Sequence, residues 1–281
     1  MEKRFPCVAG TFYPAEKEKL KRMIEGFLNE VSLPKIKGKV FGILSPHAGY
    51  IYSGKVAAYS FKSIASRKIE RVILIGVSHQ EIFKGLSLWK KGNWLTPLGE
   101  VPLDVEFLEE ISKEFKDIGE GPHLFEHSLE VQLPFLQIVL KENFKIVPIL
   151  LGSDDLDLIK TLAKFLAKEI FKKETIIVAS SDLSHYPPDE IAKKADKETL
   201  KAILTKEINV LEETILKLES EFPEVDTFLC GKSAVKVLME IAKNIKNSYG
   251  EILYYQNSSE VSFDKSQVVG YGSLYFSKLI Q

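Results

Sequence analysis

The sequence predicts an α/β protein of three layers, in which helices cover both faces of a mostly parallel or mixed central sheet. The first observation is a set of short apolar runs, rich in valine and isoleucine and each followed by Gly, Ser or Pro, at 40–44, 71–77, 145–151 and 175–180. The second is that helical patterns separate these runs. Strands joined by helices of this length require right-handed crossovers, which place parallel strands between two helical layers.

A helix is expected before the first strand. Its apolar positions recur at helical spacing and are Leu20, Met23, Ile24, Phe27, Leu28 and Val31. Pro14 lies near its start and Pro34 lies beyond its end, as is typical of residues that flank a helix. The opposite face carries charged residues, so this helix should pack one face on the core and expose the other.

The rest of the chain continues the alternation. Further helices are expected at 54–65, 104–115, 127–142, 155–171, 188–204, 207–218 and 232–246. Two late strands are expected at 251–256 and 268–276, the second at an edge of the sheet or beside a central strand. No repeat, low-complexity tract or Gly/Ser/Pro-rich linker interrupts the sequence, so we expect one domain over residues 1–281.

The composition excludes several classes of function. The 38 basic and 39 acidic residues nearly cancel, and the sequence lacks the basic stripe typical of nucleic-acid binding. No apolar run approaches the roughly 20 residues that cross a bilayer, and no signal peptide is recognisable. The only cysteines, Cys7 and Cys230, lie far apart. We therefore expect a cytoplasmic protein without disulfides. Its heavy use of Lys and Glu is the bias of hyperthermophile proteins.

Side chains suited to metal binding and proton transfer follow three of the predicted strands. His47 follows the first, His79 the second, and the pair Asp182 and His185 the fourth. In open α/β sheets the ligand crevice lies beyond the carboxyl ends of the strands, where these loops converge. The chain has only five histidines, so the placement of three of them at one edge of the sheet indicates a functional site.

Each of these residues also has a purely structural interpretation. A single histidine after a strand can cap the next helix or bond a neighbouring carbonyl, and Asp182 can be an N-cap. Cys230 directly precedes a predicted helix, where the dipole favours a thiolate, but a free cysteine is more often a small buried apolar residue. Taken alone, Cys230 and Cys7 are therefore assigned no role. The convergence of the other residues favours a site over separate structural roles.

Two further histidines were considered. On a helix, His127 and Glu130 share a face, so the carboxylate could orient the ring, or the two could form an ordinary surface pair. His123 is predicted to be a loop residue without a role. Fingerprints of P-loop nucleotide binding, dinucleotide binding, serine hydrolases and zinc metalloproteases are absent from the sequence.

Seven segments, in order, carry a family resemblance: VAGTFYPA, SPHAGYIYSGKVAAYSF, VSH, TPLGEVPLD, EHSLEVQLPFLQ, SSDLSHY and FLCGKSAV. Together they resemble the Memo family over practically the whole chain. The resemblance implies a fold similar to the LigB-type extradiol dioxygenases, which use non-haem iron. It implies metal ligands at His47, His79 and Cys230, with Asp182, His185 and His127 close by, and it reverses the structural interpretation of Cys230.

The resemblance and the residues together give three functional hypotheses. The first is a redox or dioxygenase-like enzyme that uses Fe(II), or else copper or zinc, with His185 or His127 as acid–base and Asp182 as a further ligand or orienting group. The second is a scaffold that binds a peptide or protein, with Tyr50, Tyr52 and Tyr186 stacking on it. The third is a zinc-dependent hydrolase. The resemblance also implies AMMECR-type and radical-SAM proteins as partners in a shared but undefined pathway. The expected ligand of the pocket is an unknown small molecule or peptide.

Overall fold

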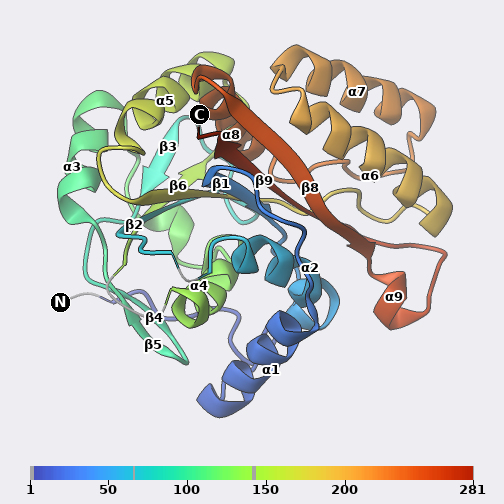
Figure 1. Cartoon of the computed structure of the whole chain (residues 1–281), viewed down its shortest axis with the longest axis horizontal. Coiled ribbons are helices and arrows are strands. Elements are labelled where there is room, and N and C mark those ends of the chain that lie inside the picture. The colour runs from blue at the N-terminus through green and yellow to red at the C-terminus, as the bar shows by residue number, and fades with distance from the viewer. Residues whose placement is uncertain (1–2, 66, 141–143, 281) are drawn as a thin grey trace.

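A seven-stranded mixed sheet forms the centre of the computed structural model, which describes residues 3–65, 67–140 and 144–280 (Figure 1). The strand order is β3-β6-β2-β7-β1-β9-β8. Its four central strands are mutually parallel and are β1 (Lys39–Ser45), β2 (Arg71–Val77), β6 (Lys145–Leu151) and β7 (Thr175–Ser180). They coincide with the four apolar runs, so the predicted α/β class is confirmed.

Antiparallel strands flank the parallel centre. On one side, β3 (Leu86–Leu88) pairs with β6. On the other, β9 (Gly270–Lys278) pairs with β1, and β8 (Ser248–Asn257) forms the edge beyond β9. The two late strands are thus confirmed, the second beside a central strand. A small hairpin of β4 (Trp94–Thr96) and β5 (Gly99–Val101) lies outside the main sheet; like β3, its strands have three residues, too few for a periodic pattern.

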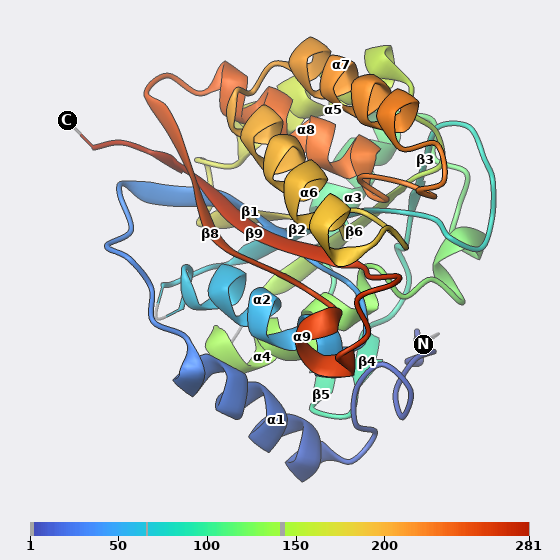
Figure 2. The ribbon, with the colours of Figure 1, turned by 90° about the vertical axis from the view of Figure 1, so that its right-hand side faces the viewer.

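Helices cover both faces of the sheet, as Figure 2 shows. One face carries α1 (Lys17–Glu30), α2 (Tyr50–Lys62) and α4 (Leu133–Val139). The other carries α5 (Leu156–Glu169), α6 (Asp189–Leu204), α7 (Ile208–Glu221) and α8 (Lys232–Asn244). The remaining helices are α3 (Val105–Glu114), which contacts β6, and the single turn α9 (Ser259–Ser262). The predicted three-layer arrangement is therefore present.

The predicted helix over 127–142 is shorter than expected. A 3-10 turn, η2 (Glu130–Gln132), leads into α4, and His127 lies ahead of both. Pro134 has no amide hydrogen and is tolerated in the first turn of a helix, which favours a start at this point. Positions 141–143 of the prediction fall outside the described residues. A second 3-10 turn, η1 (Gly121–His123), includes His123, which was expected in a loop.

A large apolar core joins the sheet to its helices, from Leu20 of α1 to Phe276 of β9. A smaller apolar cluster, Ala195, Leu218, Val225 and Phe228, lies apart from it at α6 and α7. All strand residues of β7 and all but the first of β1 and β6 are buried, as expected for parallel strands covered on both faces. In the described ranges, no helix is both long enough and apolar enough to span a membrane.

A buried carboxyl group joins α6 to strand β8 and to the loop that follows β7. Asp196 is fully buried; its Oδ1 accepts the Ser184 N–H at 2.9 Å, and its Oδ2 accepts the hydroxyls of Ser184 at 3.0 Å and Tyr255 at 2.8 Å. Burial raises the pKa of Asp196 from about 4 to about 7, because these hydrogen bonds offset only part of the lost hydration.

This raised pKa predicts a pH-dependent cost to stability. Since the folded state holds the proton more tightly than the unfolded chain, Asp196 lowers the free energy of unfolding as pH rises from about 4 to about 7. Asp196→Asn does not titrate, so its stability relative to the natural protein should increase with pH through this window. Urea denaturation of both proteins at several pH values measures the difference; a difference independent of pH would contradict the prediction.

Candidate metal centre

The loops that follow β1, β2 and β7 bring three predicted residues to the carboxyl edge of the sheet. His47, His79 and Asp182 each lie two residues beyond the end of their strand. The ring centroids of His47 and His79 are 4.9 Å apart. The predicted convergence is therefore present, because parallel neighbouring strands end at the same edge of the sheet.

A third histidine completes the cluster. The His127 ring lies 4.7 Å from that of His79 and 5.4 Å from that of His47, and Phe12 packs on its other side at 4.8 Å. One ring nitrogen from each of the three histidines lies within 4.8 Å of the other two. His47 is buried, whereas 28% of the His79 side chain is exposed, so the cluster can be reached from solvent.

Cys230 lies beside this cluster, directly before Gly231 at the start of α8. Its Sγ is 3.2 Å from Nε2 of His47 and accepts the Asp182 N–H at 3.2 Å. Burial, and then the nearby Asp182 carboxyl, raise the pKa of the Cys230 thiol to about 12, so the thiol keeps its proton at neutral pH. The sulfur is thus surrounded by polar groups of the cluster rather than by hydrocarbon alone.

Asp182 stabilises the loop that carries His47. Its Oδ1 accepts the His47 N–H at 2.8 Å, and its Oδ2 is 4.0 Å from His47 Nε2. Burial raises the pKa of Asp182 to about 7, although hydrogen bonds from the His47 loop oppose this shift. Asp182 therefore bonds a segment distant in sequence, and it can exchange a proton near neutral pH.

His185 has a buried ring nitrogen without a hydrogen-bond partner. Its backbone N–H donates to Thr227 O at 2.9 Å, but Nε2 has no partner among the described residues. Burial lowers the pKa of His185, so the ring is neutral at physiological pH. The following residue, Tyr186, has a φ of 68° and is 50% exposed. A bulky side chain is uncommon in this left-handed conformation, which is typical of functional sites.

The sequence interpretation missed Glu126, a buried carboxylate between two histidines. Its Oε1 lies 3.0 Å from Nδ1 of His79 and 3.5 Å from Nδ1 of His127. Its Oε2 accepts a hydrogen bond from the backbone N–H of His79. Burial alone would raise the pKa of Glu126, but these contacts lower it to about 2. Glu126 directly precedes the helix expected over 127–142. Because partners were sought on the face of that helix, only Glu130 was considered as the carboxylate beside His127.

Glu130, which was considered as the carboxylate partner of His127, instead binds the N-terminal segment. It pairs with Arg4 at 2.7 Å and accepts the Tyr13 hydroxyl at 2.6 Å. Neither alternative considered for Glu130, an orienting group for the His127 ring or a surface pair with it, is found among the described residues, because His127 lies in a loop and not on the expected helix. His123, assigned no role, is fully buried, and its Nε2 is 3.0 Å from Ser87 O.

The electrostatics of the cluster favour neutral rings at His47 and His127, whereas His79 binds a proton more readily. Burial lowers the pKa of His47 well below its usual value, and the neighbouring rings of His79 and His127 lower it further. Burial also lowers the pKa of His127. Burial alone would lower the pKa of His79, but its hydrogen bond and ion pair with Glu126 raise it overall. Neutral imidazoles with lone pairs are the form that binds metal ions.

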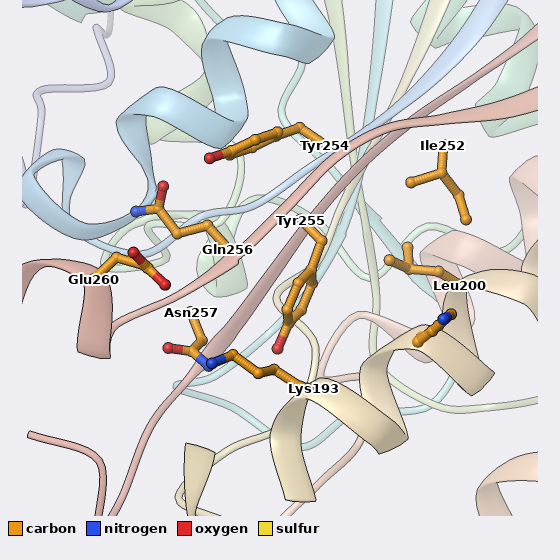
Figure 3. Close-up of a pocket in the computed structure, with 9 residues that line it drawn as sticks. Lys193, Leu200, Ile252, Tyr254, Tyr255, Gln256, Asn257 and Glu260 are labelled. Atoms are coloured by element: carbon orange, nitrogen blue, oxygen red, sulfur yellow. The ribbon is translucent and has the colours of Figure 1, made fainter. Parts of the chain in front are cut away.

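A cavity of about 360 Å³ opens beside the cluster. It is lined by His79 and Cys230, by Lys232 at the start of α8, and by hydroxyl groups such as those of Ser78 and Thr227. A second cavity, of about 500 Å³, lies between α6 and β8 (Figure 3). Its wall is formed by Lys193, Lys197, Leu200, Ile252, Tyr254, Tyr255, Gln256, Asn257 and Glu260. It has no histidine or cysteine in its wall, so the first cavity is the one that adjoins the candidate chemistry.

Comparison with known proteins identifies the family. A family model described as "Memo-like protein" matches residues 4–275. The chain belongs to the Memo family. Relatives named "MEMO1 family protein" share 38% identity in Nitrosopumilus maritimus, 39% in Aquifex aeolicus and 40% in Methanococcus maripaludis. The alignments cover 97%, 98% and 97% of this chain and 99%, 100% and 99% of the respective relatives.

A solved structure supports the fold of this Memo-family chain. It is described as an uncharacterized protein from Escherichia coli, matches with a TM-score of 0.51 at 12% sequence identity, and covers 84% of this chain and 99% of its own. At this identity the likeness concerns the fold alone. The resemblance to the Memo family that the seven sequence segments carry is confirmed by the full-length relatives.

Proposed function

We propose that this Memo-family protein binds one divalent transition-metal ion at the carboxyl edge of its sheet. His47, His79 and His127 supply nitrogen ligands, and Cys230 supplies a thiolate when it loses its proton. The observation that carries the proposal is the approach of one ring nitrogen from each histidine to within 4.8 Å of the other two. The family resemblance had implied His47, His79 and Cys230 as ligands, and the proposal adds His127 to that set.

The spacing of the donors fits a single ion after small side-chain movements. Two nitrogens bound tetrahedrally at 2.0–2.1 Å are about 3.3 Å apart, and a nitrogen and a sulfur at 2.3 Å are about 3.5 Å apart. The separation of 3.2 Å between Cys230 Sγ and His47 Nε2 is close to the second value. The wider limit of 4.8 Å for the histidines requires them to close inward on binding.

The donor set narrows the choice of metal. Imidazole suits iron, copper and zinc, and a thiolate excludes the hard ions magnesium and calcium. We propose Fe(II), with copper or zinc as the alternatives. When bound, such an ion would supply Lewis acidity and, for iron or copper, redox chemistry.

The other polar groups give the site acid–base capacity on a small molecule. His185 is neutral with an unpartnered Nε2, so it can accept a proton from a bound molecule. Asp182, with a pKa raised to about 7 by burial, can hold or release a proton at neutral pH. The adjoining cavity has room for a compact substrate. The function best supported is therefore a metal-dependent, dioxygenase-like redox enzyme.

The test is metal analysis of full-length protein purified anaerobically without chelators. We expect about one equivalent of metal in the natural protein and at least a tenfold lower content in His47→Ala, which removes a ligand. His123→Gln is the matched control, because His123 is a buried histidine outside the cluster. Metal-free natural protein, or full occupancy in His47→Ala, would contradict the proposal. Zinc as the only metal would favour the hydrolase hypothesis.

A second candidate function is peptide binding at the same site. Tyr186 favours it, because a half-exposed aromatic ring held in a left-handed backbone conformation beside His185 is suited to stack on a ligand. Peptide pull-downs with the natural protein and with His47→Ala distinguish the two: recovery that persists without bound metal favours a scaffold, and recovery that requires the metal favours the metal centre.

A further inference from the structure

The Nδ1 atoms of all three candidate ligands lie against oxygen atoms of the surrounding protein. Nδ1 of His47 is 2.9 Å from Ser180 Oγ, and Nδ1 of His79 and His127 are 3.0 and 3.5 Å from the same Glu126 oxygen. We infer that Glu126 and Ser180 are positioning residues that hold the three rings as Nδ1–H tautomers, so that each Nε2 presents its lone pair. That these lone pairs serve to bind a metal ion rests on the proposed metal centre.

Glu126 can only accept hydrogen bonds from these rings. Its Oε2 accepts the backbone N–H of His79, and its Oε1 accepts the backbone N–H of Ser128 at 2.7 Å. An ionised carboxylate has no proton to donate. The hydrogen in the bond between His79 and Glu126 therefore lies on Nδ1. His127 Nδ1 makes no hydrogen bond to this carboxylate, but the negative oxygen 3.5 Å away favours a hydrogen on that nitrogen over a lone pair. Histidine ligands that donate their other nitrogen to a carboxylate are fixed in tautomer and orientation.

Ser180 imposes the same tautomer on His47 by a different route. A hydroxyl group has one proton, and Ser180 donates it to the carbonyl of Ser128 at 2.7 Å. Gln132 donates its side-chain amide to Ser180 Oγ at 3.0 Å and to the carbonyl of Pro46 at 3.0 Å, which fixes the orientation of that amide. The same amide nitrogen lies 3.3 Å from the Ser128 carbonyl, a longer contact than that of Ser180 with this carbonyl. We therefore assign the Ser180 proton to its nearest acceptor, the Ser128 carbonyl at 2.7 Å rather than His47 Nδ1 at 2.9 Å. Ser180 then accepts from His47, which places the hydrogen of that ring on Nδ1.

The free nitrogen of His47 explains the contact with Cys230. With the hydrogen on Nδ1, Nε2 of His47 accepts from the thiol, whose Sγ lies 3.2 Å away. Sγ in turn accepts the Asp182 N–H. Metal binding would replace this thiol hydrogen and leave the three imidazole tautomers unchanged. The histidines therefore need no proton rearrangement to bind an ion.

His123 provides an internal reference with the opposite tautomer. Its Nε2 lies 3.0 Å from the carbonyl of Ser87, and a carbonyl only accepts, so His123 carries its hydrogen on Nε2. The ring is fully buried. One protein should therefore contain both tautomers at assigned positions, which a single spectrum can compare.

The test is long-range nitrogen–proton correlation NMR on the metal-free, full-length protein labelled with ¹⁵N at histidine. Spectra are recorded at alkaline pH, where the imidazoles are neutral. We expect a protonated Nδ1 and an unprotonated Nε2 for His47, His79 and His127, and the reverse for His123. Assignment comes from single His→Gln variants. A protonated Nε2 on His79 or His47 would overturn the inference.

Variants test the two positioning residues separately. Glu126→Gln places an amide next to His79 and should convert His79 and His127 to mixed tautomers, whereas Ser180→Ala should do so only for His47. Glu126→Asp serves as a second variant if Glu126→Gln does not fold. Asp104→Asn is the matched control, since Asp104 is a buried carboxylate paired with Arg71 away from the cluster. Unchanged tautomers in both Glu126→Gln and Ser180→Ala would overturn the positioning role.

A metal titration separates this inference from the proposed function. Loss of a hydrogen-bond partner behind a metal ligand typically lowers affinity about 10–100-fold, and we expect this decrease for Glu126→Gln with Co(II) as the probe, but not for Asp104→Asn. If the natural protein shows the expected tautomers but binds no metal, the tautomer assignment is upheld and the metal centre is rejected. If it binds metal with equal affinity in Glu126→Gln, the metal centre is upheld and the role of Glu126 is rejected.

Discussion

Replacement of Arg4 by alanine is expected to lower the free energy of unfolding by about 3–5 kcal/mol, the usual result of removing one partner of a buried ion pair. The side chains of Arg4 and Glu130 are 1% and 0% exposed, and Nη1 lies 2.7 Å from Oε2. Without Arg4, the Glu130 carboxylate would remain buried without its counter-ion. The cost arises mainly from that unpaired charge.

Arg4 also holds the loop that carries Glu126 and His127. Its Nε donates to His123 O at 2.9 Å and its Nη2 donates to Glu126 O at 2.6 Å, while its guanidinium lies 4.2 Å from the Trp94 ring centroid. A planar guanidinium with five donors can make these contacts at once, and a lysine ammonium cannot. Arg4→Lys should therefore recover only part of the lost stability.

Chemical denaturation at neutral pH measures this effect. Lys39→Ala is the control, since the Lys39–Glu174 pair is about 41% exposed on each side and should contribute little. Burial alone would raise the pKa of Glu130, but Arg4 and several N–H and O–H donors lower it. The stabilisation by Glu130 is therefore complete above the unfolded-state pKa and declines as pH falls through the folded-state pKa. An Arg4→Ala protein as stable as the natural one would show that the Arg4–Glu130 ion pair does not stabilise the fold.

The sheet and the approach of His47 to His79 were predictable from sequence because both depend on short-range patterns. The four parallel strands appear as apolar runs, and the strand ends locate His47, His79 and Asp182 without any knowledge of strand order. Cys230 was different: a thiol before a helix is usually structural, and only the family resemblance identified it. Its 3.2 Å contact with His47 joins residues 183 positions apart, which no local pattern encodes.

The buried polar network behind the site was missed for the same reason. Glu126 lies just outside the helix expected over 127–142, on which only Glu130 was considered as a partner of His127, and Arg4 lies in a segment without periodicity. Their partners are chosen by tertiary packing: Arg4 binds Glu130, 126 positions away. Sequence patterns thus predicted which residues reach the site, whereas the groups that orient them depend on contacts between distant segments.

Substitution of Gly231 by alanine is expected to reduce both stability and the contact between Cys230 and His47. A Cβ at this position would lie 2.3 Å from Ser180 O and 2.6 Å from the Ser181 Cβ. The first of these is a backbone atom of the last residue of β7, so no flexible side chain can relieve the clash. Overpacking of this kind costs about 1–3 kcal/mol.

The clash should displace the segment that carries Cys230. Gly231 directly follows Cys230 and donates its N–H to Ser181 Oγ at 2.8 Å, which joins the start of α8 to the β7 loop. Moving α8 away from Ser180 and Ser181 would lengthen the distance of 3.2 Å between Sγ and His47 Nε2. We expect Cys230 to react faster with a thiol reagent in Gly231→Ala than in the protein with the natural Gly231. Both proteins also carry Cys7→Ser, so that Cys230 is the one thiol that reacts.

Gly26→Ala is the control, and we expect it to raise the stability of the protein rather than to lower it. A Cβ at Gly26 in α1 would meet no atom within 4 Å, and Gly→Ala inside a helix stabilises by roughly 0.5–1 kcal/mol. Denaturation midpoints and thiol reaction rates are measured on both variants. The residues just before α8 contribute Cys230 to the cluster, and the loop after β7 contributes Asp182. A Gly231→Ala protein with the stability and the thiol reactivity of the natural protein would mean that the close packing of these two segments does not hold the sulfur beside His47.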